Sequence, residues 1–244
     1  MGMPITVEVI DASVSEALFD KVFNYFDYVD GKFSTYKEHS EISRLNHHEL
    51  ELEDASEDMK TIFELAEQTR QETRGFFDIQ HKGFTDPSGL VKGWAINNAA
   101  GILVENGLQN FYVDAGGDIQ VRGRNSRGRN WRVGIRNPFN MDEIVKVLSL
   151  TDCGVATSGT YIRGLHIYNP KNDDRSFNDI MSLTVIGPDI FEADRFATAA
   201  FAMGCEGINF IESLQGFEGY MIDRDRTSTF TTGFERFVLH DQMD

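Results

Sequence analysis

The order of strand-like and helix-like segments limits the fold more than any other feature of this sequence. Alternating apolar residues predict a strand at residues 3–10, and further strand-like runs follow one another between residues 110 and 187 and near the C-terminus. The predicted helices lie in separate stretches, around residues 14–31, 56–74, 90–105 and 188–204. Because helices and strands do not alternate regularly, we expect an α+β fold. No linker or repeat interrupts the chain, so residues 1–244 are expected to form a single compact unit, with antiparallel or mixed sheets, packed helices and a cleft.

The charge balance restricts the class of partner. The formal net charge is −16, with 39 acidic and 23 basic residues. Nucleic acids and anionic membranes attract basic surfaces, so neither is expected as the main partner. A negatively charged ligand would need local help from a metal ion, a lysine or backbone amides.

The sequence contains no targeting or spanning segment that we can identify. Residues 1–10 lack the basic region and the small-residue cleavage site of a signal peptide. No run approaches the roughly 18 apolar residues that a membrane helix requires. We therefore expect a cytoplasmic protein with no membrane span.

One predicted helix, residues 188–204, carries a pair of oxygen-bearing side chains. Asp194 and Thr198 are four residues apart, so both lie on the same side of the helix. Mg²⁺ prefers oxygen ligands and takes only one or two of them from carboxylates. The pair therefore suggests a magnesium site. The alternative is a core helix in which Asp194 pairs with a nearby arginine.

Two other segments could approach an anionic ligand. The run from Asp114 to Asp118 places Gly116 and Gly117 between two predicted strands, where bare amides could contact a ligand. An ordinary hairpin turn explains the same residues equally well. Lys92 lies near a predicted helix start, where it could receive a phosphate, although a solvated surface lysine is the alternative.

Several single residues are further candidates. His166, between Leu165 and Ile167, could transfer a proton near neutral pH, or could be a satisfied core histidine. Ser158 lacks the surroundings of a nucleophilic serine, so we interpret it as a loop residue that could contact ligand. The aromatic candidates for stacking on a ring are Tyr36, Phe76, Phe77, Trp94 and Tyr161, with core packing as the alternative for Phe76 and Phe77.

A series of short motifs occurs along the chain in a fixed order. They are FSTYKEHSEISRLN (33–46), GFFD (75–78), DPSGLVKGWA (86–95), VDAGGD (113–118), ATSGTY (156–161), HIYNP (166–170) and ADRFAT (193–198). Together the series resembles the ApbE family, the FAD:protein FMN transferases. The resemblance runs from the first residue to about Gly204 and implies an ApbE-like (T-fold-like) fold with a central cofactor cleft.

The resemblance implies roles for particular residues. Members of this family use Mg²⁺ to cleave the diphosphate of FAD, pass FMN to a threonine or serine of an acceptor protein and release AMP. The positions that match the metal ligands are Gly89, Asp194, Ala197 and Thr198, with Gly89 and Ala197 contributing carbonyl oxygens. The positions that match contacts to FAD are Met1, Tyr36, Phe76, Phe77, Asp78, Asp86, Lys92 and Tyr168. His166 matches the proposed proton-transfer group.

Three functions remain open from the sequence. The first is Mg²⁺-dependent transfer of FMN from FAD to an acceptor flavoprotein. The second is an FAD pyrophosphatase, in which water replaces the acceptor hydroxyl, and the third is a non-catalytic FAD-binding protein. The chain departs from most family members in its short segment between Asp78 and Asp86 and in the residues that follow His166.

Overall fold

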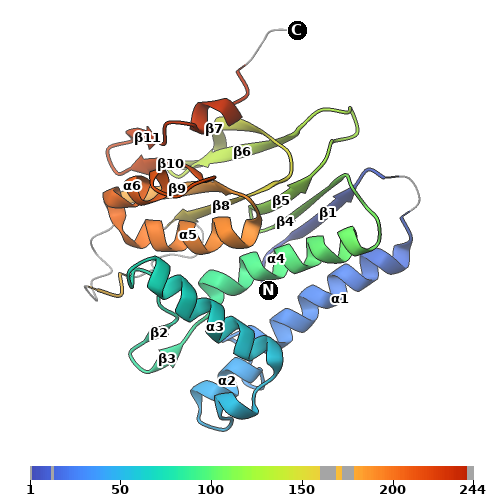
Figure 1. Ribbon diagram of the computed structural model, residues 1–244, viewed down its shortest axis with the longest axis vertical. Coiled ribbons are helices and arrows are strands. Elements are labelled where there is room, and N and C mark those ends of the chain that lie inside the picture. Colours follow the sequence, from blue (N-terminus) through green and yellow to red (C-terminus); the bar gives the residue numbers. More distant parts are fainter. Residues whose placement is uncertain (1, 12–13, 160–168, 172–178, 241–244) are drawn as a thin grey trace.

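A seven-stranded sheet forms one half of the molecule (Figure 1). The computed structural model describes residues 2–11, 14–159, 169–171 and 179–240. Every described strand pair is antiparallel. In spatial order the strands of the large sheet are β1 (Ile5–Val9), β4 (Phe111–Ala115), β5 (Asp118–Arg122), β8 (Cys153–Gly159), β9 (Ile180–Gly187), β10 (Glu218–Asp223) and β11 (Ser228–Phe230).

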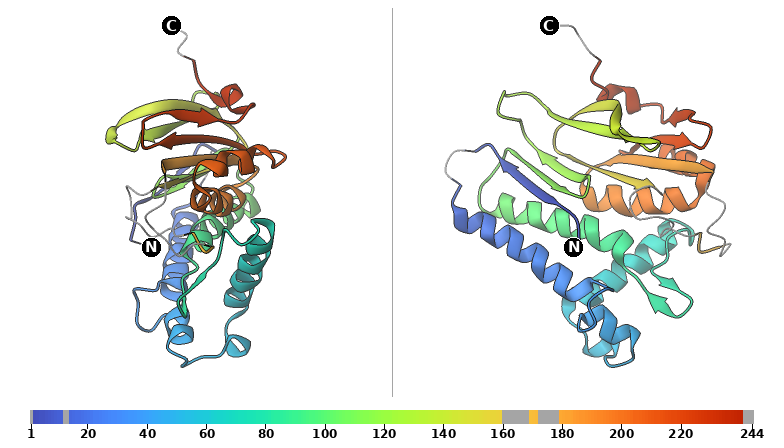
Figure 2. Two further views of the ribbon diagram at one scale, coloured as in Figure 1. Left: turned by 90° about the vertical axis from the view of Figure 1, so that its left-hand side faces the viewer. Right: turned by 180° about the vertical axis from the view of Figure 1, so that it is seen from behind.

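Two hairpins lie outside the large sheet. Strands β6 (Trp131–Asn137) and β7 (Asn140–Leu150) form a ribbon, and β2 (Gln80–His81) pairs with β3 (Phe84–Thr85). The β6–β7 ribbon packs on the face of the large sheet opposite α4 and α5 (Figures 1 and 2). Trp131, Val133 and Ile135 of β6 face inward and share a buried cluster with residues of the sheet.

The helices cover the other face. The α-helices are α1 (Glu16–Phe33), α2 (Glu41–Asn46), α3 (Glu57–Glu72), α4 (Ser88–Glu105), α5 (Ile190–Ala202) and α6 (Gly207–Glu212). Short 3-10 turns lie at Leu52–Asp54, Gly204–Glu206 and Phe234–Phe237. Helices α4 and α5 cross the middle of the molecule, and α1 to α3 lie beyond them (Figure 1). Within the described residues, no helix is both long enough and apolar enough to cross a lipid bilayer.

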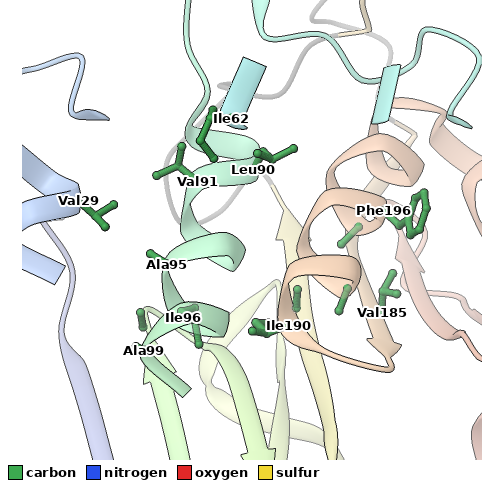
Figure 3. Packing of buried hydrophobic residues seen from close by; sticks show 14 of the residues in the cluster. Val29, Ile62, Leu90, Val91, Ala95, Ile96, Ala99, Val185, Ile190 and Phe196 are labelled. Atoms are coloured by element: carbon green, nitrogen blue, oxygen red, sulfur yellow. The ribbon is translucent and has the colours of Figure 1, made fainter. Parts of the chain in front are cut away.

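Close packing of α4 against α5 joins the two halves. Leu90 and Ile96 of α4 and Ile190 of α5 are fully buried in the larger core cluster (Figure 3). Gly93 makes this approach possible, because a Cβ atom there would lie 2.7 Å from the Cβ of Asp194 and 2.8 Å from the carbonyl oxygen of Ile190. Small residues at such contacts allow two helix backbones to come near each other.

The expected α+β class is confirmed, and several local expectations are wrong. Ser158, interpreted as a loop residue, lies in strand β8 and is only 6% exposed. Residues 76–79 resemble a strand in sequence but have no strand partner in the structure. The composition of residues 81–89, HKGFTDPSG, predicts a loop, yet the segment contains most of the β2–β3 hairpin, with Gly83 at a positive φ of 81°. The run VLSLTDCGVAT (147–157) predicts one strand, but the structure has two, β7 and β8, because the chain turns at Thr151 and Asp152.

Candidate active site

Three charged residues from three different elements meet where α4 and α5 approach the sheet. Lys92 of α4 forms an ion pair with Asp118 of β5, and its Nζ lies 3.6 Å from Oδ1 of Asp194 on α5. The backbone amide of Gly93 donates to Oδ2 of Asp194 at 2.8 Å. The other oxygen of Asp118, Oδ1, accepts from the amide of Thr157 on β8 at 3.0 Å. We call Lys92, Asp118 and Asp194 the Lys92 cluster.

The start of α5 is fixed by contacts with the sheet. Asp189 caps the helix by accepting a hydrogen bond from the amide of Glu192 at 2.9 Å. The buried side chain of Gln120 on β5 accepts from the amide of Ile190 at 2.8 Å. Gly154 of β8 lies directly beneath, since a Cβ atom there would come within 2.1 Å of the same amide nitrogen. These contacts determine where Asp194, one turn further along α5, is presented.

Burial gives the Lys92 cluster an unbalanced charge. Asp118 is 2% exposed and Asp194 is 3% exposed, and a single lysine faces both. Burial raises the pKa of Asp194 to about 7; Lys92 opposes this rise, and the negative charge of Asp118 adds to it. Two buried carboxylates beside one ammonium group leave an excess of negative charge, which a further cation would balance.

Further oxygen donors suited to a hard cation lie one helical turn along α5 from Asp194 and at the start of α4. The hydroxyl of Thr198 donates to the carbonyl oxygen of Gly89 at 3.3 Å, so α5 and the first turn of α4 bring these two oxygens together. No group of three or more His, Cys, Asp or Glu residues forms a candidate metal centre among the residues that the structure describes. A metal ion here would therefore use mixed donors, one carboxylate with hydroxyl and carbonyl oxygens, which is a set that fits Mg²⁺.

The metal-ligand candidates lie around one large cavity, of about 970 Å³. Gly89, Asp194 and Thr198 line it, whereas the fully buried Ala197 does not. The cavity lies at the upper end of the size range of small-molecule sites, roughly 300–1,000 Å³. Four phenylalanines contribute to its wall: Phe33, Phe76, Phe77 and Phe84. Phe77 adjoins the metal-ligand candidates, because a Cβ atom on Gly89 would lie 3.5 Å from its ring.

The structure brings most of the predicted ligand contacts to this cavity. Those that line it are Tyr36, Phe76, Phe77, Asp78, Asp86, Lys92, Gly116 and Ser158. Tyr36 is 98% exposed, so it lies at the rim. Met1, Tyr161, His166 and Tyr168 fall outside the described residues. Trp94, a candidate for stacking on a ligand ring, does not line the cavity and packs against Tyr25 and Phe33 instead.

The turn between β4 and β5 contributes less directly. Asp114, Gly117 and Asp118 do not line the cavity. Asp114 accepts from the amide of Gly117 at 2.8 Å and so shapes the turn, while Asp118 supports Lys92. Gly116 and Gly117 have φ angles of 66° and 96°, a region that favours glycine and explains the pair.

Sequence reasoning missed part of the cavity wall. The β2–β3 hairpin contributes His81, Lys82 and Phe84. This hairpin is held by the side chain of Asn46, which donates to the carbonyl of Thr85 at 2.9 Å and accepts from its amide at 2.8 Å. The turn residues Lys82 and Gly83 could have indicated a hairpin. The two strands have only two residues each, which is too short to show an alternating strand pattern.

Comparisons with known proteins agree with this geometry. The model of the ApbE family matches residues 1–86 and 82–221. The chain is 29% identical over 151 residues to the FAD:protein FMN transferase of Klebsiella pneumoniae, a match that covers 58% of this chain and 43% of the relative. For the enzyme of the same name from Escherichia coli K12, the identity is 29% over 154 residues, covering 59% of this chain and 44% of the relative. The matched region is thus less than half the length of these relatives.

Solved structures match over nearly the whole chain. The flavin transferase ApbE from Vibrio cholerae superposes with a TM-score of 0.85 at 24% identity, covering 97% of this chain and 96% of that one. The ApbE protein of Thermotoga maritima gives a TM-score of 0.83 at 20% identity, covering 97% and 95% of the two chains. At these identities the match shows a shared fold.

Proposed function

Because this chain belongs to the ApbE family, we propose that it is an FAD:protein FMN transferase that modifies a threonine or serine of an acceptor flavoprotein. In this reaction the acceptor hydroxyl oxygen bonds to the phosphorus of the FMN half of FAD. The bond from that phosphorus to the bridging oxygen of the diphosphate breaks, and AMP leaves with the bridging oxygen. The hydroxyl proton passes to a base. The names of the relatives support the proposal, since they describe this transfer for those proteins.

One observation carries the proposal. A single cavity combines an aromatic wall with the half-buried Lys92 and with the oxygen donors of Asp194, Thr198 and Gly89. FAD has the same two parts, a flat ring system and a doubly charged diphosphate. Apolar walls bind rings, and lysines and helix N-termini bind phosphates.

The residues that would hold Mg²⁺ are Asp194 and Thr198, with the carbonyl oxygens of Gly89 and Ala197. When bound, the ion supplies positive charge that stabilises a diphosphate and the developing charge of the departing AMP. The excess negative charge of the Lys92 cluster supports this assignment.

Other residues of the cavity would orient FAD. We propose that Lys92 and the first turn of α4 attract the diphosphate, and that Phe76, Phe77 and Tyr36 contact the flat rings. The remaining proposed contacts are Met1, Asp78, Asp86, Gly116, Ser158 and Tyr168. Asp114, Gly117 and Asp118 do not line the cavity, so their proposed role is indirect: they shape the β4–β5 turn and hold Lys92. His166 stays the proposed base that accepts the hydroxyl proton, with Asp194 as the other catalytic residue.

Incubation with FAD, MgCl₂ and candidate acceptor proteins tests this function. Transfer predicts flavin fluorescence that stays with the acceptor on a denaturing gel, together with one equivalent of AMP. Free FMN with AMP would instead identify an FAD pyrophosphatase. FAD that binds but stays intact would identify a binding protein. Omission of Mg²⁺, or its removal with EDTA, should stop AMP release.

Two further expectations also stay proposals. We propose that residues 1–244 form one domain, because the larger core cluster includes residues from Val22 to Met221. Limited proteolysis that releases one stable core would support this. A cytoplasmic location stays a prediction, which fractionation of cells that express the tagged chain would test.

A further inference from the structure

An unusual concentration of arginine lies on the side of the molecule away from the helices. Six of the 23 basic residues lie between positions 122 and 136, and no Asp or Glu occurs from residue 119 to residue 141. Five of these arginines are exposed: Arg124, Arg127, Arg129, Arg132 and Arg136. We call these five residues the arginine stripe. In a chain with a net charge of −16, such a stripe is a local reversal of sign.

The arginine stripe runs along the outer face of β6. Burial alternates along this strand, so Trp131, Val133 and Ile135 face the sheet while Arg132 and Arg136 face outward. Arg124, Arg127 and Arg129 extend the stripe into the β5–β6 loop. Ile144 of β7, which is 46% exposed, is the cross-strand partner of Arg136 and adds an apolar contact surface.

Among the described residues, three other arginines form ion pairs with carboxylates, whereas the stripe arginines do not. Arg70, Arg195 and Arg236 each form an ion pair with a glutamate. Within the described part of the chain, none of the five stripe arginines forms an ion pair. The protein has many carboxylates but leaves these guanidinium groups facing solvent. A binding partner with an acidic surface would complement them.

The strand β6 packs on the strand that leads to the edge of the cavity. The ring centroid of Trp131 on β6 lies 5.6 Å from that of Tyr112 on β4, and the hydroxyl of Tyr112 donates to Asp114 at 3.2 Å. Asp114 in turn bonds to the β4–β5 turn, in which Gly116 lines the cavity. A protein seated on the stripe therefore extends to the cavity edge.

We infer that the arginine stripe is a docking surface for the acceptor protein, which binds it through an acidic face while its hydroxyl group enters the cavity. This inference rests on the proposed transfer function and adds the chemistry of the partner. The strand β6 is roughly 20 Å long. A standard protein interface buries about 800 Å² on each side, so the acceptor would also contact surface beyond β6.

Other partners fit the stripe less well. A nucleic acid or an anionic membrane extends far beyond the stripe and would meet the acidic remainder of the surface. A second copy bound through the same face would place arginines against arginines.

Charge reversal of the stripe with a matched control tests the inference. Arg129→Glu/Arg132→Glu changes two exposed side chains for which the structure gives no hydrogen bond or ion pair. Lys21→Glu/Arg44→Glu makes the same change in net charge at exposed positions outside the cavity wall. Wild-type enzyme and FAD are first added to an extract of the source cells, and the protein that becomes covalently fluorescent is purified. This protein is then titrated as the acceptor.

We expect the stripe variant to raise the KM for this acceptor about tenfold, with an effect that shrinks at high salt, while FAD binding and kcat stay near wild type. The control variant should retain the wild-type KM. Equal KM values for all three proteins would overturn the docking surface and leave the transfer function intact. No labelled protein with wild-type enzyme would overturn both. The wild-type protein is also assayed for binding to phosphatidylglycerol vesicles, for binding to single-stranded DNA and for self-association. If the stripe variant lost one of these interactions while its KM for the acceptor stayed at the wild-type value, the inference would be overturned.

Discussion

Helix α5 contributes to two charged clusters that contain the same number of positive and negative charges but have different surroundings. On one side, Asp194 joins Lys92 and Asp118. On the other, the next residue, Arg195, forms ion pairs with Glu72 of α3 and with Glu192 at 2.6 Å. Each cluster contains one cation and two carboxylates. We call the second one the Arg195 cluster.

Access to solvent separates these clusters. The side chains of Asp118 and Asp194 are 2% and 4% exposed, whereas those of Glu72 and Glu192 are 38% and 25% exposed. Water therefore screens the excess charge of the Arg195 cluster more strongly than that of the Lys92 cluster. The same set of charges therefore stabilises a helix contact on one side and leaves a place for a cation on the other.

The largest effect should come from removing the buried carboxylate on the cavity side. Asp194→Asn takes away the only carboxylate among the metal-ligand candidates, and we expect AMP release from FAD to fall at least about 100-fold. Glu192→Gln, which neutralises a carboxylate of the Arg195 cluster on the same helix, should leave the rate near wild type. Rates measured across a Mg²⁺ titration compare the variants. Wild-type turnover by Asp194→Asn would refute the functional difference between the clusters.

A substitution that forces α4 and α5 apart should strongly reduce the stability of the protein. Gly93→Ala places a Cβ atom 2.7 Å from that of Asp194, and we expect a loss of about 3 kcal/mol in the free energy of unfolding. Gly101 lies on the same helix with no atom within 4 Å of an added Cβ. Gly101→Ala should therefore be neutral or stabilising by about 0.5–1 kcal/mol. Urea denaturation measures both, and similar midpoints for the two variants would contradict the close packing.

Loss of the Arg195 cluster should reduce stability more than activity. Arg195→Met removes the ion pairs to Glu72 and Glu192 and the contact with the ring of Phe196, whose centroid lies 4.0 Å from the guanidinium carbon. Because both glutamates reach solvent, we expect a cost of about 1–2 kcal/mol rather than that of a fully buried pair. Turnover of the folded protein at saturating Mg²⁺ should change little. A large fall in kcat without loss of stability would assign the Arg195 cluster to the active site.

The smallest effect concerns pH. Burial raises the pKa of Glu72, but hydrogen bonds from Gln68 and Arg195 outweigh burial and hold the pKa below its usual value. The stability that this carboxylate contributes is therefore complete above its unfolded pKa of about 4.3 and is lost as the pH falls through the lower folded value. The stability difference between wild type and Glu72→Gln should shrink by less than about 1 kcal/mol below pH 4.3. A difference that grew with acid would contradict this sign.

Local patterns in the sequence predict much of the fold and part of the site. Periodic apolar residues predict α5, and the spacing of Asp194 and Thr198 predicts that both lie on one side of it. The glycine pair predicts the turn between β4 and β5, where both residues have positive φ angles. Short-range geometry controls each of these features, so neighbouring residues are sufficient to reveal them.

Partners far apart in the sequence could not be predicted in this way. The sequence left open whether Asp194 pairs with an arginine, and the structure gives Lys92 as its neighbour while Arg195 turns to α3. Asp118 supports Lys92 rather than lining the cavity. The β2–β3 hairpin depends on Asn46, about forty residues earlier in the chain.

The sequence by itself determined the elements and their motifs, because backbone preferences and apolar periodicity act over a few residues. Only the tertiary structure decided which charges share a buried site. That choice depends on how closely α4 approaches α5 at Gly93 and on which side chains the sheet places beneath them. Burial then makes two clusters with equal numbers of charges behave differently, because charge interactions are stronger where water is excluded. Packing of the whole chain controls that exclusion.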